Sequence, residues 1–140
     1  MTQDQMRPKI IAMTRDVVEQ TGIKLTGSTY LTWDNCNDDN SAPYRATVTG
    51  GFRGKPTIAE SETEVDQWVA TLKKHGWSAQ SGPSRSVSRY LSGPEDFSMA
   101  FVPHLDPEPQ PGADFVVSSG CSLTEDLKDA NAENITKQFS

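Results

Sequence analysis

Cys36 and Cys121 carry the most distinctive chemistry in this chain of 140 residues. Each stands at the end of a segment that is expected to be a strand. Two widely spaced cysteines in a small polar domain favour a disulfide, because a covalent bond compensates for a thin hydrophobic core. The residues leave two alternatives open: a pair of buried free thiols, or a reactive cysteine. A disulfide would favour an extracytoplasmic location.

Catalysis would require a nucleophile beside a base and an orienting group. Cys121 with His104 is the cysteine and histidine pair that neighbouring strands could bring together. The serine-rich segment 84–88 lacks the Gly-x-Ser-x-Gly pattern of a serine nucleophile. We therefore predict that the protein is not an enzyme, and we keep the pair Cys121 and His104 as a minor alternative.

Metal-binding patterns are incomplete in this sequence. His75 and His104 have no cysteine or histidine at the close spacing of a zinc site. The acidic turn that holds Asp34, Asp38 and Asp39 fails the EF-hand pattern, which needs a glycine at its sixth position. An irregular calcium site on these three aspartates is an alternative to a solvated turn. We predict no metal site.

A glycine-rich turn at 50–56 invites comparison with a phosphate-binding loop. Gly50 and Gly54 are separated by three residues instead of four, and Pro56 follows Lys55 where the motif needs Ser or Thr. We therefore interpret this segment as the connection between a strand and a helix, and we predict no cofactor.

Three arginines could form a binding face. Arg85 and Arg89 are four positions apart in a segment that is expected to be a strand, so their side chains would point the same way. Arg45 alternates with apolar residues on another expected strand. We predict that Arg45, Arg85 and Arg89 lie on a sheet face that no helix covers, where a protein or an envelope component could bind. A solvated polar face is the alternative, and the proline-rich segment 103–113 is a second place for contact.

The composition limits the classes of partner. Asp and Glu number 19 against 13 Lys and Arg, so the net charge is −6. This excess of acid argues against binding to nucleic acid, which requires clustered cations. The chain lacks an apolar run of the length that spans a bilayer. It also lacks a signal segment at its start, so we expect either a cytosolic protein or one whose N-terminal anchor was removed.

Periodicity predicts the elements that position these residues. Apolar residues recur at helical spacing over 5–21 and again after the sequence Ser61-Glu62-Thr63-Glu64, which has the pattern of a capping box. Alternating or β-branched segments predict strands at 25–33, 44–49, 84–91, 97–102 and 115–121.

The order αββαβββ predicts an α+β fold, a two-layer sandwich in which two helices cover one face of a mostly antiparallel sheet of about five strands. We expect a single domain over residues 1–123. The polar segment 124–140 is expected to be a C-terminal tail that frays after at most one short helical turn.

Three segments of this layout resemble a known family. They are Trp33-Asp34-Asn35-Cys36, the helix end Lys73-Lys74-His75-Gly76-Trp77, and Ser119-Gly120-Cys121. Over residues 5–123 the pattern resembles the cell-envelope lipoprotein domains of actinobacteria, of the mycobacterial LppA type. The cysteine that would carry the lipid is absent from this sequence. The resemblance implies a secreted, extracytoplasmic domain. Its membrane anchor would be an N-terminal segment that was removed, and the family offers no catalytic residues that can be assigned to this chain.

Two functional hypotheses follow. The first is a non-enzymatic, lipoprotein-like domain in the cell envelope that binds a protein or an envelope component. The alternative is a cytosolic acidic protein of the immunity or inhibitor type that binds a basic partner. This alternative predicts two free thiols and an association that weakens as salt increases.

Overall fold

The computed structural model describes residues 1–39, 41–80, 88–105 and 109–139, and for residues 104–105 and 109–112 it describes the backbone alone. The elements in chain order are α1 (Gln3–Thr21), β1 (Leu25–Asn35), β2 (Tyr44–Phe52), α2 (Ile58–Lys73), β3 (Ser78–Ala79), β4 (Arg89–Ser92), η1 (Pro94–Asp96), β5 (Ser98–Leu105), β6 (Pro109–Ser118), β7 (Glu133–Asn134) and η2 (Thr136–Phe139).

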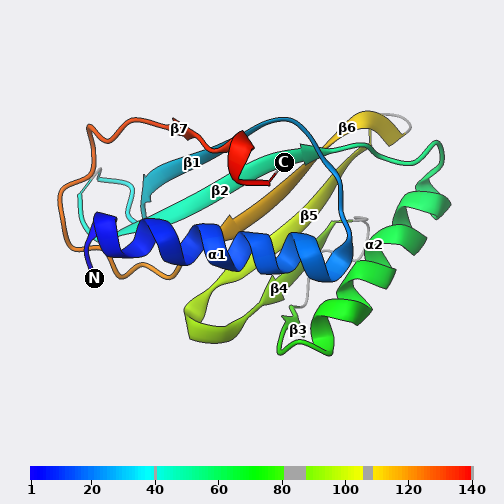
Figure 1. Cartoon of the computed structure of the whole chain (residues 1–140), viewed down its shortest axis with the longest axis horizontal. Helices are drawn as coiled ribbons and strands as arrows, with labels where there is room; N and C mark the ends of the chain where they lie inside the picture. The colour runs from blue at the N-terminus through cyan, green and yellow to red at the C-terminus, as the bar shows by residue number, and fades with distance from the viewer. Residues whose placement is uncertain (40, 81–87, 106–108, 140) are drawn as a thin grey trace.

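Within the described residues, the strands form one sheet in the order β3-β4-β5-β6-β2-β1-β7 (Figure 1). Every pair of neighbouring strands is antiparallel. The long strands occupy the middle of the sheet, and both edge strands are two residues long. The predicted α+β class is confirmed, although the sheet has seven strands where about five were expected.

The core lies between the sheet and the two helices. Alternate residues of five strands line up across the sheet and are at most 3% exposed: Leu31, Val48, Val117, Met99 and Leu91. Burial of each such side chain stabilises the fold by about 1.5–3 kcal/mol. Helix α1 packs on β2 and β6, and α2 packs on β3, β4 and β5. Both helices therefore cover the same face.

Helix α1 begins and ends at residues suited to those positions. Thr2 and Gln5 form a capping box, in which the Thr2 hydroxyl accepts from the backbone N–H of Gln5. At the other end Gly22 has a φ of 72°, which a residue with a Cβ adopts only at a cost. Ile10 and Val17 on the inner face are fully buried. The predicted stripe of apolar residues is confirmed.

Helix α2 begins earlier than the predicted capping box. Its N-cap is Thr57, whose hydroxyl accepts from the backbone N–H of Glu60. Ser61 instead lies buried within the first turns, and its hydroxyl accepts from the backbone N–H of Lys55 at 3.3 Å. The predicted start at 61 is wrong because a threonine four residues upstream caps equally well. The inner face of the helix, with Val65, is buried as expected.

The second half of the sheet differs from the prediction in extent. The proline-rich segment 103–113 was expected to be a loop, but β5 runs to Leu105, β6 starts at Pro109, and Leu105 pairs with Pro109. Prolines are tolerated where strand pairing is irregular, and the register between β5 and β6 shifts between Pro103 and Leu105. Of the expected strand 84–91, residues 84–87 lie outside the described part, and β4 begins at Arg89.

Between β4 and β5 the chain makes a close turn against Trp77. A Cβ added at Gly93 would lie 2.5 Å from the nearest atom of the Trp77 ring, which is itself 4% exposed. The turn continues through Glu95 and Asp96, which have φ values of 54° and 65°. A side chain at position 93 would therefore require this buried ring to shift.

The C-terminal segment is packed against the body, contrary to the expected fraying after residue 123. Leu127 and Ile135 are buried at 6% and 2% exposure. Strand β7 pairs with β1, where Asn134 lies opposite Tyr30. The carboxylate of Glu133 accepts two hydrogen bonds from the Arg7 guanidinium of α1. A boundary at residue 123 would therefore divide one packed unit.

Candidate functional site

The face of the sheet opposite the helices is the main candidate site. A row of hydroxyl side chains crosses it at one register level, with one member from each of five strands: Thr32, Thr47, Ser118, Ser98 and Ser92. The hydroxyl oxygens of Thr47 and Ser118 are 3.4 Å apart. Thr47 is only 8% exposed, whereas Ser92 is exposed and the other three members are partly exposed. Because a hydroxyl both donates and accepts, the accessible members of this row can bond to a ligand in either sense.

A second row lies beside the hydroxyl row. It contains Tyr30 of β1, Thr49 of β2, Val116 of β6, Ala100 of β5 and Tyr90 of β4. The two tyrosines at its ends are 44% and 38% exposed, and the three residues between them are small. Four strand spacings of about 4.8 Å place the tyrosines about 19 Å apart. We call this surface, with a large side chain at each end and smaller ones between, the trough.

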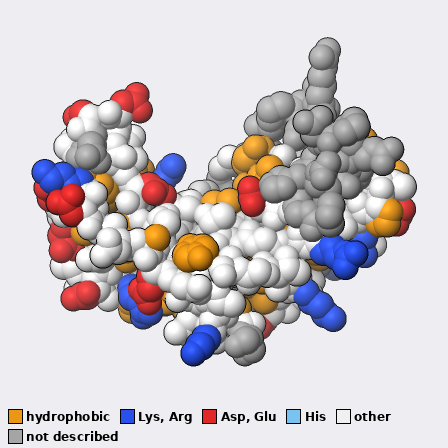
Figure 2. Space-filling model, turned by 90° about the horizontal axis from the view of Figure 1, so that it is seen from above, with side chains coloured by type: hydrophobic (Ala, Val, Ile, Leu, Met, Phe, Trp, Pro, Cys, Tyr) orange, Lys and Arg blue, Asp and Glu red, His pale blue; other side chains and the backbone are white. Residues whose placement is uncertain are grey.

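Figure 2 shows this side of the molecule in outline. The side turned away from α1 forms the upper outline, and acidic side chains gather at its raised left end. Both helices pack on the other face of the sheet. Among the described residues, this face therefore carries exposed aromatic side chains at the two ends of one row and hydroxyl groups along the other.

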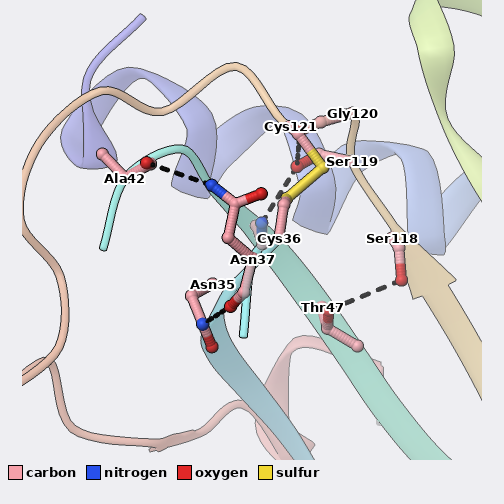
Figure 3. Close-up of a disulfide and its surroundings, with 10 residues drawn as sticks. Asn35, Cys36, Asn37, Ala42, Thr47, Ser118, Ser119, Gly120 and Cys121 are labelled. Carbon is pink, nitrogen blue, oxygen red and sulfur yellow. Dashed lines mark hydrogen bonds between the residues drawn. A yellow bond between two sulfur atoms is a disulfide. The ribbon is translucent and has the colours of Figure 1, made fainter. Parts of the chain in front are cut away.

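The disulfide fixes one end of this face. Cys36 and Cys121 are bonded, and their Cα atoms are 6.2 Å apart, which confirms the predicted pair (Figure 3). The bond joins the end of β1 to the segment after β6, and β2 runs between them. Beside it, the Ser119 hydroxyl accepts from the backbone N–H of Ala46 at 2.9 Å and donates to the Gly120 carbonyl. The strand ends around the trough are thus held at fixed positions.

The loop that leads from Cys36 to β2 is ordered by its own side chains. The Asn35 amide donates to the Asn37 carbonyl, and the Asn37 amide donates to the Ala42 carbonyl at 3.4 Å (Figure 3). The Ser41 hydroxyl donates to the Asp39 carboxylate at 2.6 Å, and this bond lowers the pKa of Asp39.

The acidic loop does not assemble a cation site in the described residues. The Asp39 carboxylate accepts from Ser41, and the Asp34 carboxylate accepts from the Thr32 hydroxyl at 3.4 Å. The structure shows no group of three or more His, Cys, Asp or Glu residues in the described part that could hold a metal ion. Asp34 lies in β1 opposite Arg45, and the Asp39 carboxylate is bonded to Ser41 within the turn.

The structure separates the three arginines that were expected to share a face. Arg45 lies on the uncovered face opposite Asp34 and is exposed. Arg89 instead points to the helix side, where its guanidinium bonds to Asp66 at 2.9 Å and to Glu62 at 3.2 Å on α2. Arg85 lies outside the described residues. The placement of Arg89 on the open face is therefore wrong.

The pattern of buried and exposed residues along β4 shows why that placement of Arg89 was wrong. Leu91 is two residues after Arg89 and so shares its face, and Leu91 is fully buried. The apolar Leu91 at i+2 was the local signal from which the position of Arg89 on the helix side could have been predicted. The same alternation leaves Tyr90 on the uncovered face, a residue that the sequence prediction did not select.

The minor catalytic hypothesis loses its nucleophile in this structure. The Cys121 sulfur is bonded to Cys36, and the described residues contain no free cysteine. The His104 side chain lies outside the described part. His75 is exposed just beyond the end of α2, and its backbone N–H donates to the Leu72 carbonyl at 2.9 Å.

One ion pair and one tyrosine near the C-terminal segment have shifted pKa values. The hydrogen bonds from Arg7 lower the pKa of Glu133, and the same bonds raise the pKa of Arg7. Burial, with the nearby charge of Asp126, raises the pKa of Tyr44. These shifts arise from contacts that hold the C-terminal segment on the body.

Comparison with known proteins identifies the family. The model of the family described as "Putative lipoprotein LppJ" matches residues 2–138. The chain belongs to the LppJ lipoprotein family. This match supports the predicted lipoprotein-like domain, whereas the narrower resemblance to the mycobacterial LppA type is not confirmed. No curated protein and no solved structure matches the chain.

Membership of the LppJ lipoprotein family favours an extracytoplasmic protein located in the cell envelope. The match extends through the segment after residue 123, in agreement with the packing of that segment on the body. Among the residues that the structure describes, no helix has the length and apolar character needed to cross a bilayer. The disulfide contradicts the two free thiols that the cytosolic alternative predicts.

Proposed function

We propose that this LppJ-family domain is the extracytoplasmic part of a lipid-anchored envelope protein, and that it binds a neutral polysaccharide of the envelope on the uncovered face of its sheet. The observation that carries the location is the family match over residues 2–138. The disulfide supports it, because such bonds persist in oxidising compartments.

The chemistry of the trough favours a ligand rich in hydroxyl groups. The row from Thr32 to Ser92 offers short donors and acceptors at the spacing of the strands. Tyr30 and Tyr90 at the rims offer exposed ring faces with a polar tip, which suit a ligand that has both apolar and hydroxyl surfaces. The floor between the tyrosines is formed by Thr49, Val116 and Ala100 and carries no charge. An extended, uncharged chain laid across the strands meets all these groups.

Calorimetric titration of the domain with purified envelope polysaccharide from the native host tests the binding. We expect saturable binding that falls about tenfold in each of the variants Tyr30→Ala and Tyr90→Ala, because each removes an aromatic contact worth about 1 kcal/mol or more. Ile58→Ala is the matched control, since Ile58 is equally exposed, at 45%, but lies on α2. An unchanged affinity in both tyrosine variants would refute the assignment of the trough.

A second measurement separates location from binding. Antibody detection in fractionated native cells should find the protein with the membrane and cell-wall fraction, bonded between Cys36 and Cys121. Recovery from the cytosol with reduced thiols would refute the envelope location. Capture of an envelope protein by the same face, with no binding of polysaccharide, would refute the proposed ligand and leave the location in place.

A further inference from the structure

A groove far from the trough opens where α1 ends beside α2, at the right of Figure 1. Four segments that are distant in sequence converge on it: the link from α1 to β1, the start of β1, the end of β2, and one face of α2. Its volume is about 390 Å³, within the range of small-molecule sites. The groove belongs to the helix layer, so the proposed function does not involve it.

The floor of the groove is apolar and fixed by aromatic packing. Ile23 and Phe52 line it and are nearly fully buried. The Trp68 ring also lines it, at 5.4 Å from the Phe52 ring in an edge-to-face arrangement and at 5.1 Å from the Phe101 ring. Since two rings hold Trp68, its open part is presented to the groove in one orientation. An apolar ligand would need little rearrangement to pack there.

The rim of the groove is cationic although the whole chain is acidic. Lys24 and Arg53 line it and are exposed, and neither forms an ion pair with a described residue. Glu64, the acidic residue of the lining, is neutralised by Lys55 at 3.3 Å. Two unpaired cations beside an apolar floor complement a ligand that has an anionic head and a hydrocarbon body.

We propose that this groove binds an anionic amphiphile with a single hydrocarbon chain, of the fatty-acid class. The carboxylate lies at the rim between Lys24 and Arg53, and the chain lies on Trp68, Phe52 and Ile23. This site is independent of the trough, so the domain can hold a fatty acid whether or not it binds a polysaccharide.

Calorimetric titration of the full chain with decanoate, kept below its micellar concentration, tests the site. We expect one molecule to bind per chain, and we expect the double variant Lys24→Gln/Arg53→Gln to bind about tenfold more weakly. The matched control is Lys73→Gln/Lys74→Gln, which removes two exposed cations at the end of α2 and should bind as the unmodified chain does. Decylammonium, with the same chain and a cationic head, should bind at least tenfold more weakly than decanoate.

Tryptophan fluorescence locates the bound chain. Decanoate should change the emission of the unmodified protein, and Trp68→Phe should abolish that change while near-ultraviolet dichroism confirms that the variant is folded. Any of three results overturns the proposal. They are absence of saturable binding, equal binding of decanoate and decylammonium, or an equal loss of affinity in Lys24→Gln/Arg53→Gln and in the control Lys73→Gln/Lys74→Gln.

Discussion

Removal of the disulfide should cost a large share of the stability of this domain. The bond closes a loop across a sequence separation of 85 residues. In the chain-entropy model, closure of a loop of this length stabilises the folded state by about 4–5 kcal/mol, since the unfolded chain loses conformations. The whole free energy of unfolding of a domain is about 5–15 kcal/mol. Cys36→Ser/Cys121→Ser should therefore be marginally stable.

The folded state itself should change little. Strands β1 and β6 both pair with β2 along their length, so hydrogen bonds already hold the segments that the disulfide joins. The loss of stability therefore arises in the unfolded ensemble. The free energy of unfolding should also fall more steeply with urea concentration, because the unfolded chain without the disulfide exposes more surface.

Urea unfolding followed by circular dichroism measures both quantities. The unmodified protein with reductant should behave as the double variant does, and Ser122→Ala, beside Cys121, should unfold as the unmodified protein does. If the free energy of unfolding falls by less than about 1 kcal/mol both in the double variant and in the reduced protein, the loop-closure reasoning is refuted.

Three further predictions concern the packing. Gly93→Ala should destabilise the fold by about 1–3 kcal/mol in thermal unfolding, because its methyl group would overlap the buried Trp77 ring; an unchanged melting temperature would contradict this contact. Ile135→Ala should cost about 2–4 kcal/mol in the same assay, because this side chain of the C-terminal segment is buried against the body, whereas a frayed tail would tolerate the change. The carboxylate of Glu133 has a lowered pKa in the folded state, so its ion pair with Arg7 stabilises the fold above the unfolded pKa of about 4.3. This stabilisation is lost as the pH falls through the lower folded pKa. Both partners are about 40% exposed, so Arg7→Met should lose less than about 1 kcal/mol at pH 7 and nothing below the folded pKa; an equal loss at all pH values would argue against the ion pair.

Local patterns predicted the parts of the fold that depend on local chemistry. The apolar stripes of both helices and the alternation Tyr44, Ala46, Val48 depend on the 3.6-residue and two-residue periods, which the structure confirms. The disulfide followed from two widely spaced cysteines in a small polar domain with a thin core, and the structure confirms it.

Long-range contacts account for the errors. The segment after residue 123 is polar, but Leu127 and Ile135 each find an apolar partner surface that only the folded sheet provides. For Arg89 the buried Leu91 was a local signal for the helix side, but the carboxylates that Arg89 binds are on α2, 23 and 27 residues away. The short strand β7 has no pattern of its own and exists because β1 offers it an edge.

The candidate site shows the same division. Alternation with apolar residues predicted that Arg45 lies on a strand, on the sheet face opposite the helices. The continuous rows could not be predicted, since they depend on strand order and register: β6 returns to pair with β2 and so places Ser118 beside Thr47.

The way in which the sheet ends at β7 has a consequence for aggregation. Unpaired backbone groups along an edge are where sheets of separate molecules join and aggregate. Here β7, with the hydrogen bonds between Thr29 and the segment Ile135–Thr136, occupies part of the outer side of β1, which is 11 residues long. The C-terminal segment thus prevents this part of β1 from pairing with a strand of another molecule. A molecule in which this segment has detached or been cleaved would expose a long edge, and it would be the species that seeds aggregates.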